Sequence, residues 1–393
     1  MALILFDDHS WDNLLPLTFT RPASALRIGI LTIAEKWEHE LQMKSTPLTK
    51  EYLQGKFPCR AGEENLYVNA TLLPESRILD AIRALQENRS LVKQGVLLAV
   101  RTKKHKEVSF SPDKWIREGR EYGGEVSLVD YPWKIFRLNG QEIEADFLRI
   151  TGGRESAKLS ETVRVDRPEN VFVEPGFIGG YFTLNATRGP IYLGANSEIM
   201  EESVIRGPFA LGEGAVLKMG ARIYGPTTIG PYCKVGGEVN NSVLLANTNK
   251  AHDGFLGNSV IGEWCNLGAD TNNSNLKNNY AEVKIWNYPS GSYIKTGNQF
   301  CGLIMGDHSK CGINTMFNTG TVVGVSANIF GAGFPSTFIP SFSWGGVDGI
   351  TAYKMEKVLE TANLVMERRG MQLSQEDKAI LNHIFQYSNI YRT

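Results

Sequence analysis

An apolar residue recurs at every sixth position through the centre of the chain, with small and polar residues between. The first run, without a miss, is Leu193, Ile199, Ile205, Leu211, Leu217, Ile223, Ile229 and Val235. The second run is Met305, Cys311, Phe317, Val323 and Ile329. This period is typical of a parallel β-helix, in which each short strand directs one residue inward and tight turns favour Gly and Asn.

The repeats predict a β-helix over residues 166–345. Two segments break the period, at 241–254 and at 271–302. Insertions in a solenoid usually lie on one face and often carry the function. We therefore expect the chemistry of the β-helix in these two segments.

Residues 1–165 alternate between strand-like and helix-like segments. The strand-like segments include Ala2–Phe6, Val96–Val100 and 125–129, and an amphipathic helix is expected over 74–88. This alternation predicts an α/β domain, Rossmann-like, with a mixed sheet.

Residues 346–393 change to helical spacing. Ser374 and Asp377 have the positions of a capping box at the start of the second helix. We expect two helices that cap the open end of the solenoid and cover its strand edges. The predicted domains are therefore 1–165, 166–345 and 346–393.

Composition narrows the class of protein. Lys and Arg number 41 and Asp and Glu number 42, so the formal charge of −1 gives no reason to expect a nucleic-acid partner. No apolar run approaches the ~18–20 residues of a membrane helix, and the N-terminus lacks the basic region of a signal peptide. The five cysteines contain no CxxC pair, which is typical of reduced, buried thiols. We expect a cytoplasmic protein without a membrane partner.

His252 stands among Asn, Gly and Lys residues in the segment 249–275. A histidine is a natural general base for an amine or hydroxyl that attacks a thioester, and asparagines suit a sugar ring and its N-acyl group. The residues alone leave a second interpretation open, in which a loop histidine bonds the backbone and the asparagines fill β-helix turns.

The segments 249–275 and 300–324, together with LPLTFTRPASALRIGILTIAEKW at 15–37, carry a resemblance to a known family. The chain resembles a variant branch of the bacterial bifunctional N-acetylglucosamine-1-phosphate uridyltransferase/glucosamine-1-phosphate acetyltransferases. Members of that branch are labelled sugar-1-phosphate nucleotidylyltransferases. The resemblance implies a degenerate nucleotidyltransferase-like domain, a left-handed β-helix with hexapeptide-repeat acyltransferase sites between subunits, a homotrimer, and acetyl-CoA as co-substrate.

Residue by residue, the resemblance makes His252 the catalytic base. It places Asn266 and Asn275 in the sugar and acetyl pocket, and Ala269 where the backbone meets the acetyl-CoA thioester. We also predict that His308 and Lys310 contact the coenzyme phosphates, the alternative being that His308 is a surface residue.

The chain departs from the family at the sugar-binding residues. Phe255 replaces a tyrosine and Leu276 replaces a second one. The family's Arg and Lys for the sugar phosphate have no clear counterpart, and Lys250 lies two residues before His252 instead of three. The basic residues that could replace them are Arg206, Lys218, Arg222, Lys234 and Lys250, of which Lys250 is best placed in the sequence.

The N-terminal domain lacks the glycine-rich L-x-x-G-x-G-T-R-M motif of sugar nucleotidyltransferases. Asp7 and Asp8 follow the first strand instead. The basic residues that could supply positive charge to a nucleotide are Arg21 and, further along the chain, Arg27. These residues predict a site for UTP or another nucleoside triphosphate, with Mg²⁺ on Asp7 and Asp8. The alternative is that the two aspartates only form a turn.

The resulting prediction is acetyl transfer from acetyl-CoA to a hexosamine-1-phosphate, with glucosamine-1-phosphate as the expected acceptor. Nucleotidyl transfer giving UDP-N-acetylglucosamine or a related nucleotide sugar is a second expected activity. The alternative is a non-catalytic regulatory or assembly subunit. A β-helix metalloenzyme is not expected, because the repeats hold only His252 and His308 and such a site needs three imidazoles. No resident metal site is predicted.

Overall fold

The computed structural model describes residues 1–103 and 110–392 and divides into two compact units. The first unit consists of residues 1–14, 21–26 and 31–130, and the second of 15–20, 27–30 and 131–393. The boundaries expected near 165 and 345 differ from this division, because the long helix α5 (Pro132–Thr151) and the C-terminal helices belong to the second unit. As functional boundaries they stay a prediction.

The first unit is built on a six-stranded mixed sheet in the order β2-β1-β3-β5-β4-β6. Its strands are β1 (Ala2–Phe6), β2 (Ser45–Leu48), β3 (Glu64–Asn69), β4 (Arg89–Lys93), β5 (Val96–Lys103) and β6 (Arg120–Glu121). Its helices are α1 (Ser10–Asn13), α2 (Ile33–Leu41), α3 (Ser76–Arg83) and α4 (Pro112–Arg117). The apolar run of β1 is buried because parallel neighbours flank it on both sides.

Most of the elements predicted for this unit are present. Ala2–Phe6 and Val96–Val100 lie in strands and 76–83 is helical, as expected. The strand expected at 125–129 is wrong. Leu128 forms only an isolated bridge with Leu72, because the chain turns at Ala70 and Thr71 and the segment after Leu72 forms no strand with which 125–129 could pair.

The chain order of the parallel strands creates a switch point in the first unit. From β1 the chain passes to β2 on one side and then crosses to β3 on the other. The carboxyl ends of β1 and β3 therefore meet at one edge of the sheet. In open α/β sheets ligands bind outside this edge, at the switch point.

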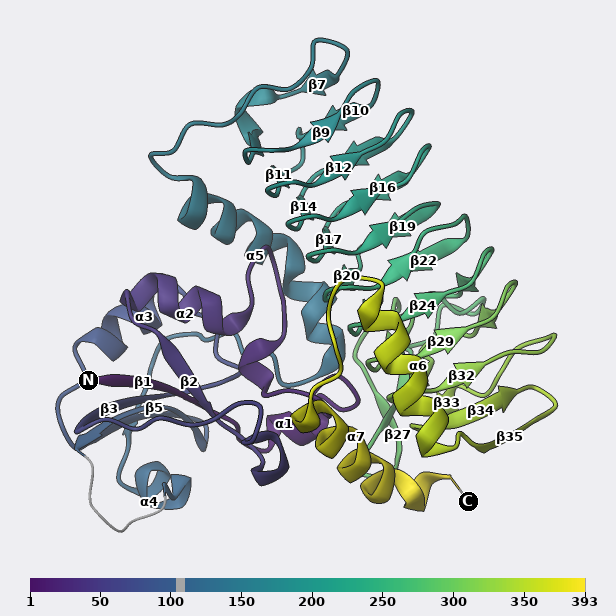
Figure 1. The fold of residues 1–393 in the computed structure, drawn as a ribbon. Coiled ribbons are helices and arrows are strands. Elements are labelled where there is room, and N and C mark those ends of the chain that lie inside the picture. The colour runs from purple at the N-terminus through teal and green to yellow at the C-terminus, as the bar shows by residue number, and fades with distance from the viewer. Residues whose placement is uncertain (104–109, 393) are drawn as a thin grey trace. The chain divides into compact units, whose positions relative to one another are not determined.

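The second unit is a parallel β-solenoid with three sheets, whose coils stack along its length (Figure 1). Sheet 1 contains β7 (Arg164–Asp166), β10 (Thr183–Asn185), β13 (Val204–Arg206), β16 (Arg222–Tyr224), β19 (Glu238–Asn240) and β22 (Phe255–Gly257). Sheet 2 contains β8 (Val171–Val173), β11 (Ile191–Leu193), β14 (Phe209–Leu211), β17 (Thr227–Ile229), β20 (Val243–Leu244), β23 (Val260–Ile261), β28 (Ile304–Met305), β31 (Val322–Val323) and β33 (Phe338–Ile339). Sheet 3 contains β9 (Ile178–Gly179), β12 (Glu198–Ile199), β15 (Val216–Leu217), β18 (Lys234–Val235), β21 (Asn249–Lys250), β24 (Asn266–Leu267), β29 (Lys310–Cys311), β32 (Asn328–Ile329), β34 (Ser343–Gly346) and β35 (Gly349–Ala352). A short pair, β25 (Asn272–Asn273) and β30 (Met316–Phe317), lies beyond β22.

The six-residue period is the core of the solenoid. All eight residues of the first apolar run are at most 2% exposed. Each lies in register with an equivalent residue of the next coil, as Leu193 does with Leu211 and Leu211 with Ile229. The fold class predicted from the sequence, an α/β domain followed by a parallel β-helix and helices, is confirmed.

The two expected interruptions differ in kind. Residues 241–254 are not an insertion, because β20 and β21 continue sheets 2 and 3 through them. Residues 274–302 do leave the coil, and they carry the antiparallel hairpin β26 (Lys284–Asn287) and β27 (Ser292–Lys295). The first interruption is therefore a coil of altered length.

Helix α5 packs along sheet 2 of the solenoid, against β14, β17, β20 and β23. A buried hydrogen-bond group fixes it there. Thr228 Oγ1 lies 2.9 Å from Gly29 O, to which it donates, and 3.0 Å from Asn139 Oδ1 of α5. The segment 27–30 therefore belongs to the solenoid's own packing.

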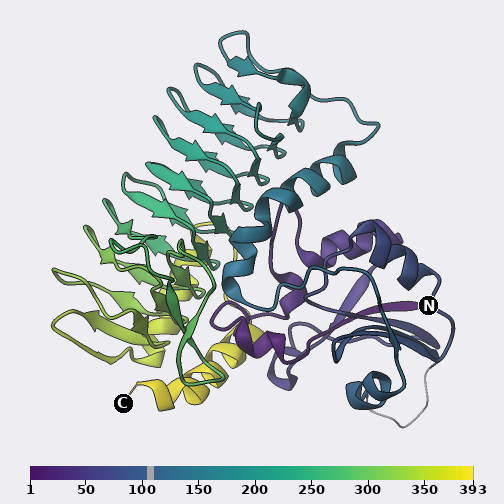
Figure 2. The ribbon, with the colours of Figure 1, turned by 180° about the vertical axis from the view of Figure 1, so that it is seen from behind.

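Two C-terminal helices are present as expected, α6 (Met355–Glu367) and α7 (Gln375–Tyr387). Ser374 Oγ accepts from Asp377 N at 3.0 Å and Asp377 Oδ2 accepts from Ser374 N at 3.3 Å, which confirms the capping box. The helices pack along the flank of the coils instead of across the end (Figure 2). Arg369, just after α6, bonds Tyr232 O and Asn249 Oδ1, several coils away from the end.

All five cysteines are free, and the four in the solenoid are buried, which agrees with reduced interior thiols. Among the described residues no helix is both long enough and apolar enough to cross a membrane.

The tight stacking of coils generates a test on two glycines that each follow an inward residue. A Cβ on Gly230 would lie 1.7 Å from Leu245 O, whereas one on Gly312 would meet nothing closer than 3.5 Å. We expect Gly230→Ala to lower the free energy of unfolding by ~4 kcal/mol or more, and Gly312→Ala to change it by about 1 kcal/mol at most. Urea unfolding of the full chain measures both, and equal effects would contradict the stacking described.

Candidate functional site

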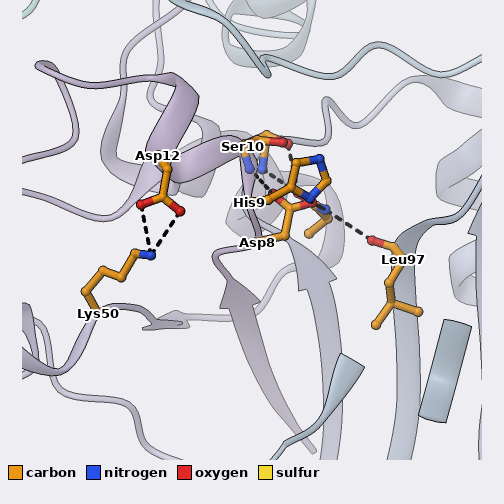
Figure 3. A network of polar contacts seen from close by, with 8 residues as sticks. Asp8, His9, Ser10, Asp12, Lys50 and Leu97 are labelled. Atoms are coloured by element: carbon orange, nitrogen blue, oxygen red, sulfur yellow. Dashed lines mark hydrogen bonds and ion pairs between the residues drawn. The ribbon is translucent and has the colours of Figure 1, made fainter. Parts of the chain in front are cut away.

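Polar side chains gather at the carboxyl ends of β1 and β3 in the first unit (Figure 3). Asp8 follows β1, and its side chain is 13% exposed. Its Oδ1 accepts from Ser10 N at 2.8 Å and its Oδ2 accepts from Asn69 Nδ2 at 2.9 Å. The carboxylate is therefore held in one orientation at the switch point, with a limited surface open to solvent.

Asn69, the last residue of β3, is fully buried and has no hydrogen-bonding capacity left. Its amide nitrogen donates to Asp8 Oδ2 and to Leu97 O, and its oxygen accepts from Thr71 N and Thr71 Oγ1. These four bonds are all that a side-chain amide can form. Asn69 therefore joins β1, β3 and β5 and orients Asp8.

Lys50 follows β2 on the same side of the sheet (Figure 3). Its Nζ lies 3.1 Å from both carboxylate oxygens of Asp12 and 4.6 Å from the centre of the Trp11 ring. Lys50 and Asp12 are each more than a third exposed. An ion pair this open is weak, so Lys50 is free to exchange Asp12 for another anion.

Asp7 directly follows β1 but is shielded. Its Oδ1 accepts from Ala23 N at 3.0 Å, while its Oδ2 is inaccessible to solvent. Burial raises the pKa of Asp7 to about 7. Asp7 is therefore largely protonated below neutral pH.

The structure brings Asp7 and Asp8 together but does not expose Arg21. That residue is only 6% exposed, and its carbonyl accepts from Trp11 Nε1 at 3.1 Å. Sequence reasoning missed Asn69 and Lys50, which are distant from Asp8 in the chain, and Asp12, which belongs to no motif. The position of Asn69 at a strand end was the one available hint.

The donor set fits Mg²⁺ only in part. Among the described residues no group of three or more His, Cys, Asp or Glu side chains could hold a metal ion. Mg²⁺ is often bound by one or two carboxylates plus substrate phosphates. Asp8 fits that role, whereas the carboxyl of Asp7 is shielded and burial raises its pKa.

In the solenoid, His252 is exposed on the corner between sheets 3 and 1, in the turn that joins β21 to β22. Asp270 N donates to Asp253 O at 3.0 Å, so the turn of Ala269 stacks on the turn of His252. Arg222 lies on the same face, with Nη2 3.8 Å from Asp253 Oδ1 and Nε 3.8 Å from Glu238 Oε2. The structure thus brings His252 and Ala269 to one corner, beside a half-exposed guanidinium.

The predicted pocket asparagines lie apart from each other. Asn266 is exposed on the outer side of sheet 3, while Asn275 follows β25 and donates to Asn258 Oδ1 at 2.7 Å. Phe255 begins β22, and its backbone N–H donates to Asn272 Oδ1 at 2.7 Å. No described hydrogen bond links Asn266, Asn275 and Phe255 to His252.

Lys250, expected to be available to a sugar phosphate, lies inside the solenoid and is 1% exposed. Its Nζ donates to Gly236 O at 3.0 Å and to His252 O at 2.7 Å. This burial favours a role within the coil over contact with a ligand.

His308 and Lys310 face α6. Tyr353, Val358 and Ala362 line the same space as these two side chains, and Lys310 Nζ donates to His308 O at 2.9 Å. Burial lowers the pKa of Lys310. In this conformation residues of α6 and Tyr353 cover the two side chains, and their contact with the coenzyme phosphates stays a prediction.

Comparison with known proteins identifies one part of the chain. Residues 3–155 match the family model described as sugar nucleotidyl transferase, so the chain contains a sugar nucleotidyl transferase-like domain. No curated protein matches.

Solved structures similar to the chain include two UDP-N-acetylglucosamine acyltransferases. The one from Arabidopsis is 15% identical with a TM-score of 0.23, covering 58% of this chain and 95% of its own. The one from Bacteroides fragilis 9343 is 16% identical with a TM-score of 0.24, covering 60% and 84%. A putative acetyltransferase from Bacillus cereus is 11% identical with a TM-score of 0.20, covering 58% and 92%. At these scores the structures support no inference about substrate or reaction.

The shielded carboxyl of Asp7 generates a pH prediction. Its pKa is raised to about 7 in the folded protein against 3.8 as the ordinary value, so the folded state binds the extra proton between these pH values. Stability from this group is complete below about pH 4 and is lost as pH rises through about 7. In the wild type, the free energy of unfolding should fall by up to about 4 kcal/mol over this pH range. We expect this fall to be absent in Asp7→Asn.

Urea unfolding of the full chain between pH 4 and pH 8 measures this difference. Asp113→Asn, at an exposed carboxyl in α4, is the control and should follow the wild type. Parallel pH curves for the wild type and Asp7→Asn would show that Asp7 does not hold a proton in the folded protein.

Proposed function

We propose that the first unit transfers a nucleotidyl group from a nucleoside triphosphate to a sugar-1-phosphate. A phosphate oxygen of the sugar attacks the α-phosphorus, the bond to the bridging oxygen breaks, and pyrophosphate leaves. The match of residues 3–155 to the sugar nucleotidyl transferase family carries this proposal. The polar cluster at the β1/β3 switch point supports it, because ligands of open sheets bind there. UTP is the first nucleotide to test, since the family resemblance implies it.

Two side chains suit this chemistry. Lys50 is a half-exposed cation whose partner Asp12 is equally accessible, so a triphosphate competes for its ammonium group. Asp8 is the carboxylate that would hold Mg²⁺ beside the phosphates, where the ion neutralises charge that develops during transfer. Asn69 orients Asp8 and contacts no ligand, because all four of its hydrogen bonds are used.

Asp8→Asn tests the site. We expect kcat/KM for pyrophosphate release to fall by ~10² or more, the scale of losing one electrostatic group aimed at the transition state. The assay uses UTP and the other nucleoside triphosphates with a panel of sugar-1-phosphates and Mg²⁺. Asp113→Asn is the control and should keep wild-type activity. Wild-type activity in Asp8→Asn would contradict the role of Asp8. If the wild type releases no pyrophosphate with any pair of nucleotide and sugar-1-phosphate, a non-catalytic subunit would be favoured.

We infer a second activity for the solenoid, acetyl transfer from acetyl-CoA to the amine of a hexosamine-1-phosphate. The amine attacks the thioester carbonyl, His252 accepts the amine proton, and the coenzyme thiolate leaves. The observation that favours it is the exposed imidazole of His252 at the corner between sheets 3 and 1. Its turn stacks on the turn of Ala269 and lies beside Arg222. Glucosamine-1-phosphate is the acceptor that the family resemblance implies.

Arg222 replaces Lys250 as the candidate for the sugar phosphate. Its guanidinium is half-exposed on the face that carries His252, and its carboxylate partners at 3.8 Å form only loose ion pairs. A guanidinium binds phosphate through two parallel N–H groups, which also fixes the ligand's orientation. Asn266 and Asn275 remain in the proposal as residues that meet the sugar from a neighbouring copy.

The proposal includes a homotrimer in the cytoplasm. Large apolar side chains on the outer surface of the first coils support self-association. Those that are at least 49% exposed there are Ile178, Tyr181, Val204 and Met219. Clusters of this kind mark protein interfaces more often than isolated apolar residues do.

His252→Ala tests the acetyl transfer. Thiol release from acetyl-CoA with glucosamine-1-phosphate should fall by ~10² or more, because a general base contributes 10²–10⁴ in rate. His39→Ala, at an exposed histidine of α2, is the control and should leave the rate unchanged. Equal rates in the wild type and His252→Ala would remove His252 from the reaction.

A further inference from the structure

Lys250 occupies an inward position of sheet 3 at which the remaining coils have an uncharged residue. Lys250 pairs in register with Val235, and the equivalent positions of the neighbouring coils hold Leu217, Leu267 and Cys311. Burying an ammonium group in an apolar column is costly unless its hydrogen bonds are satisfied. Desolvation accordingly lowers the pKa of Lys250 to about 8, so it still carries its charge near pH 7. Because burying the Lys250 ammonium group is unfavourable, its hydrogen bonds indicate its role.

The hydrogen bonds of Lys250 are made to backbone, on both sides of the turn that follows it. Its Nζ donates to Gly236 O of the preceding coil and to His252 O in its own turn. The 2.7 Å contact to His252 O is a charge-assisted bond, which is stronger than a neutral one. The ammonium group thus ties the residue that carries the imidazole to the coil beneath it.

Two other turns at the same corner are closed by a backbone bond of their own. In the turn 218–221, Ala221 N donates to Lys218 O at 3.1 Å, and in 268–271, Thr271 N donates to Gly268 O at 3.2 Å. Among the described backbone bonds none closes the turn 251–254 in this way. The turns 200–203 and 312–315 also lack such a described bond, so the feature that sets the His252 turn apart is the interior ammonium group that bonds its backbone.

We propose that Lys250 is a positioning residue that fixes the His252 turn from inside the β-helix and so directs the imidazole toward the acceptor amine. The inference rests on the acetyl transfer proposed above. Lys250 touches no substrate, because it is buried within the coil. Its loss should therefore change the rate of the chemical step more than the binding of the acceptor.

The test compares Lys250→Met with Leu267→Met in the full chain. Methionine fits the apolar column at both positions, and Leu267 is the inward residue of the next coil, 2% exposed. We expect Lys250→Met to lower kcat by ~10-fold or more with KM for glucosamine-1-phosphate changed less than ~2-fold, since a misplaced group can cost up to 10² in rate. Leu267→Met should stay within ~2-fold of the wild type in both constants.

A double variant separates positioning from general damage. If Lys250 acts through His252, then Lys250→Met in the His252→Ala background should cause no further loss. A further loss of the same size, a change in KM alone, or an unchanged kcat in Lys250→Met would overturn the proposal. Circular dichroism and the thermal midpoint report whether each variant is folded.

Hydrogen exchange gives a readout that does not need activity. Peptides over 249–257 should exchange faster in Lys250→Met, while peptides over 266–275 should not change. If the wild type releases no thiol, the acetyl transfer proposed above fails, and with it the catalytic role of Lys250. Exchange then still decides whether Lys250 anchors the turn, and unchanged exchange at 249–257 would overturn that as well.

Discussion

Coil-to-coil register is the constraint on which the second unit depends. Each inward side chain packs against the side chain at the same position of the coils above and below, as Leu193, Leu211 and Ile229 do. A parallel ladder leaves no freedom to slide, because a shift by one residue would turn the whole apolar column outward. The turns at the corners are held by the same ladders. The backbone of a corner residue such as His252 therefore has a fixed position along the solenoid axis.

The site proposed for the first unit meets a different requirement. The carboxyl ends of parallel strands bring polar groups together, and a site there needs both a fixed and an exchangeable part. Asn69 supplies the fixed part, since its saturated amide holds Asp8 against β3 and β5. Lys50 and Asp12 supply the exchangeable part, as an open ion pair that a stronger anion can replace.

The sequence predicts what repeats or is local. The six-residue period located the solenoid core, and Ser374 with Asp377 located the start of α7, because a capping box lies within one turn of chain. Contacts between residues that are distant in the chain could not be predicted from the sequence. Asn69 is 61 residues from Asp8, and nothing in the pattern around α5 indicates that this helix packs on the solenoid.

Lys250 shows most clearly why part of the site could not be predicted. Counting in sixes from Val235 gives Asn241, Asn247 and Asp253, so Lys250 falls between the inward positions and looks like a surface cation. The structure pairs Val235 with Lys250, because the coil that contains β20 and β21 is shorter than its neighbours. The turn 236–237 between β18 and β19 has two residues where the turn 218–221 has four, whereas the turn 251–254 that carries His252 keeps four. The Lys250 ammonium group bonds Gly236 O in the shortened turn and His252 O in the next one. Periodicity can detect the change in coil length, but it cannot predict this interior charge.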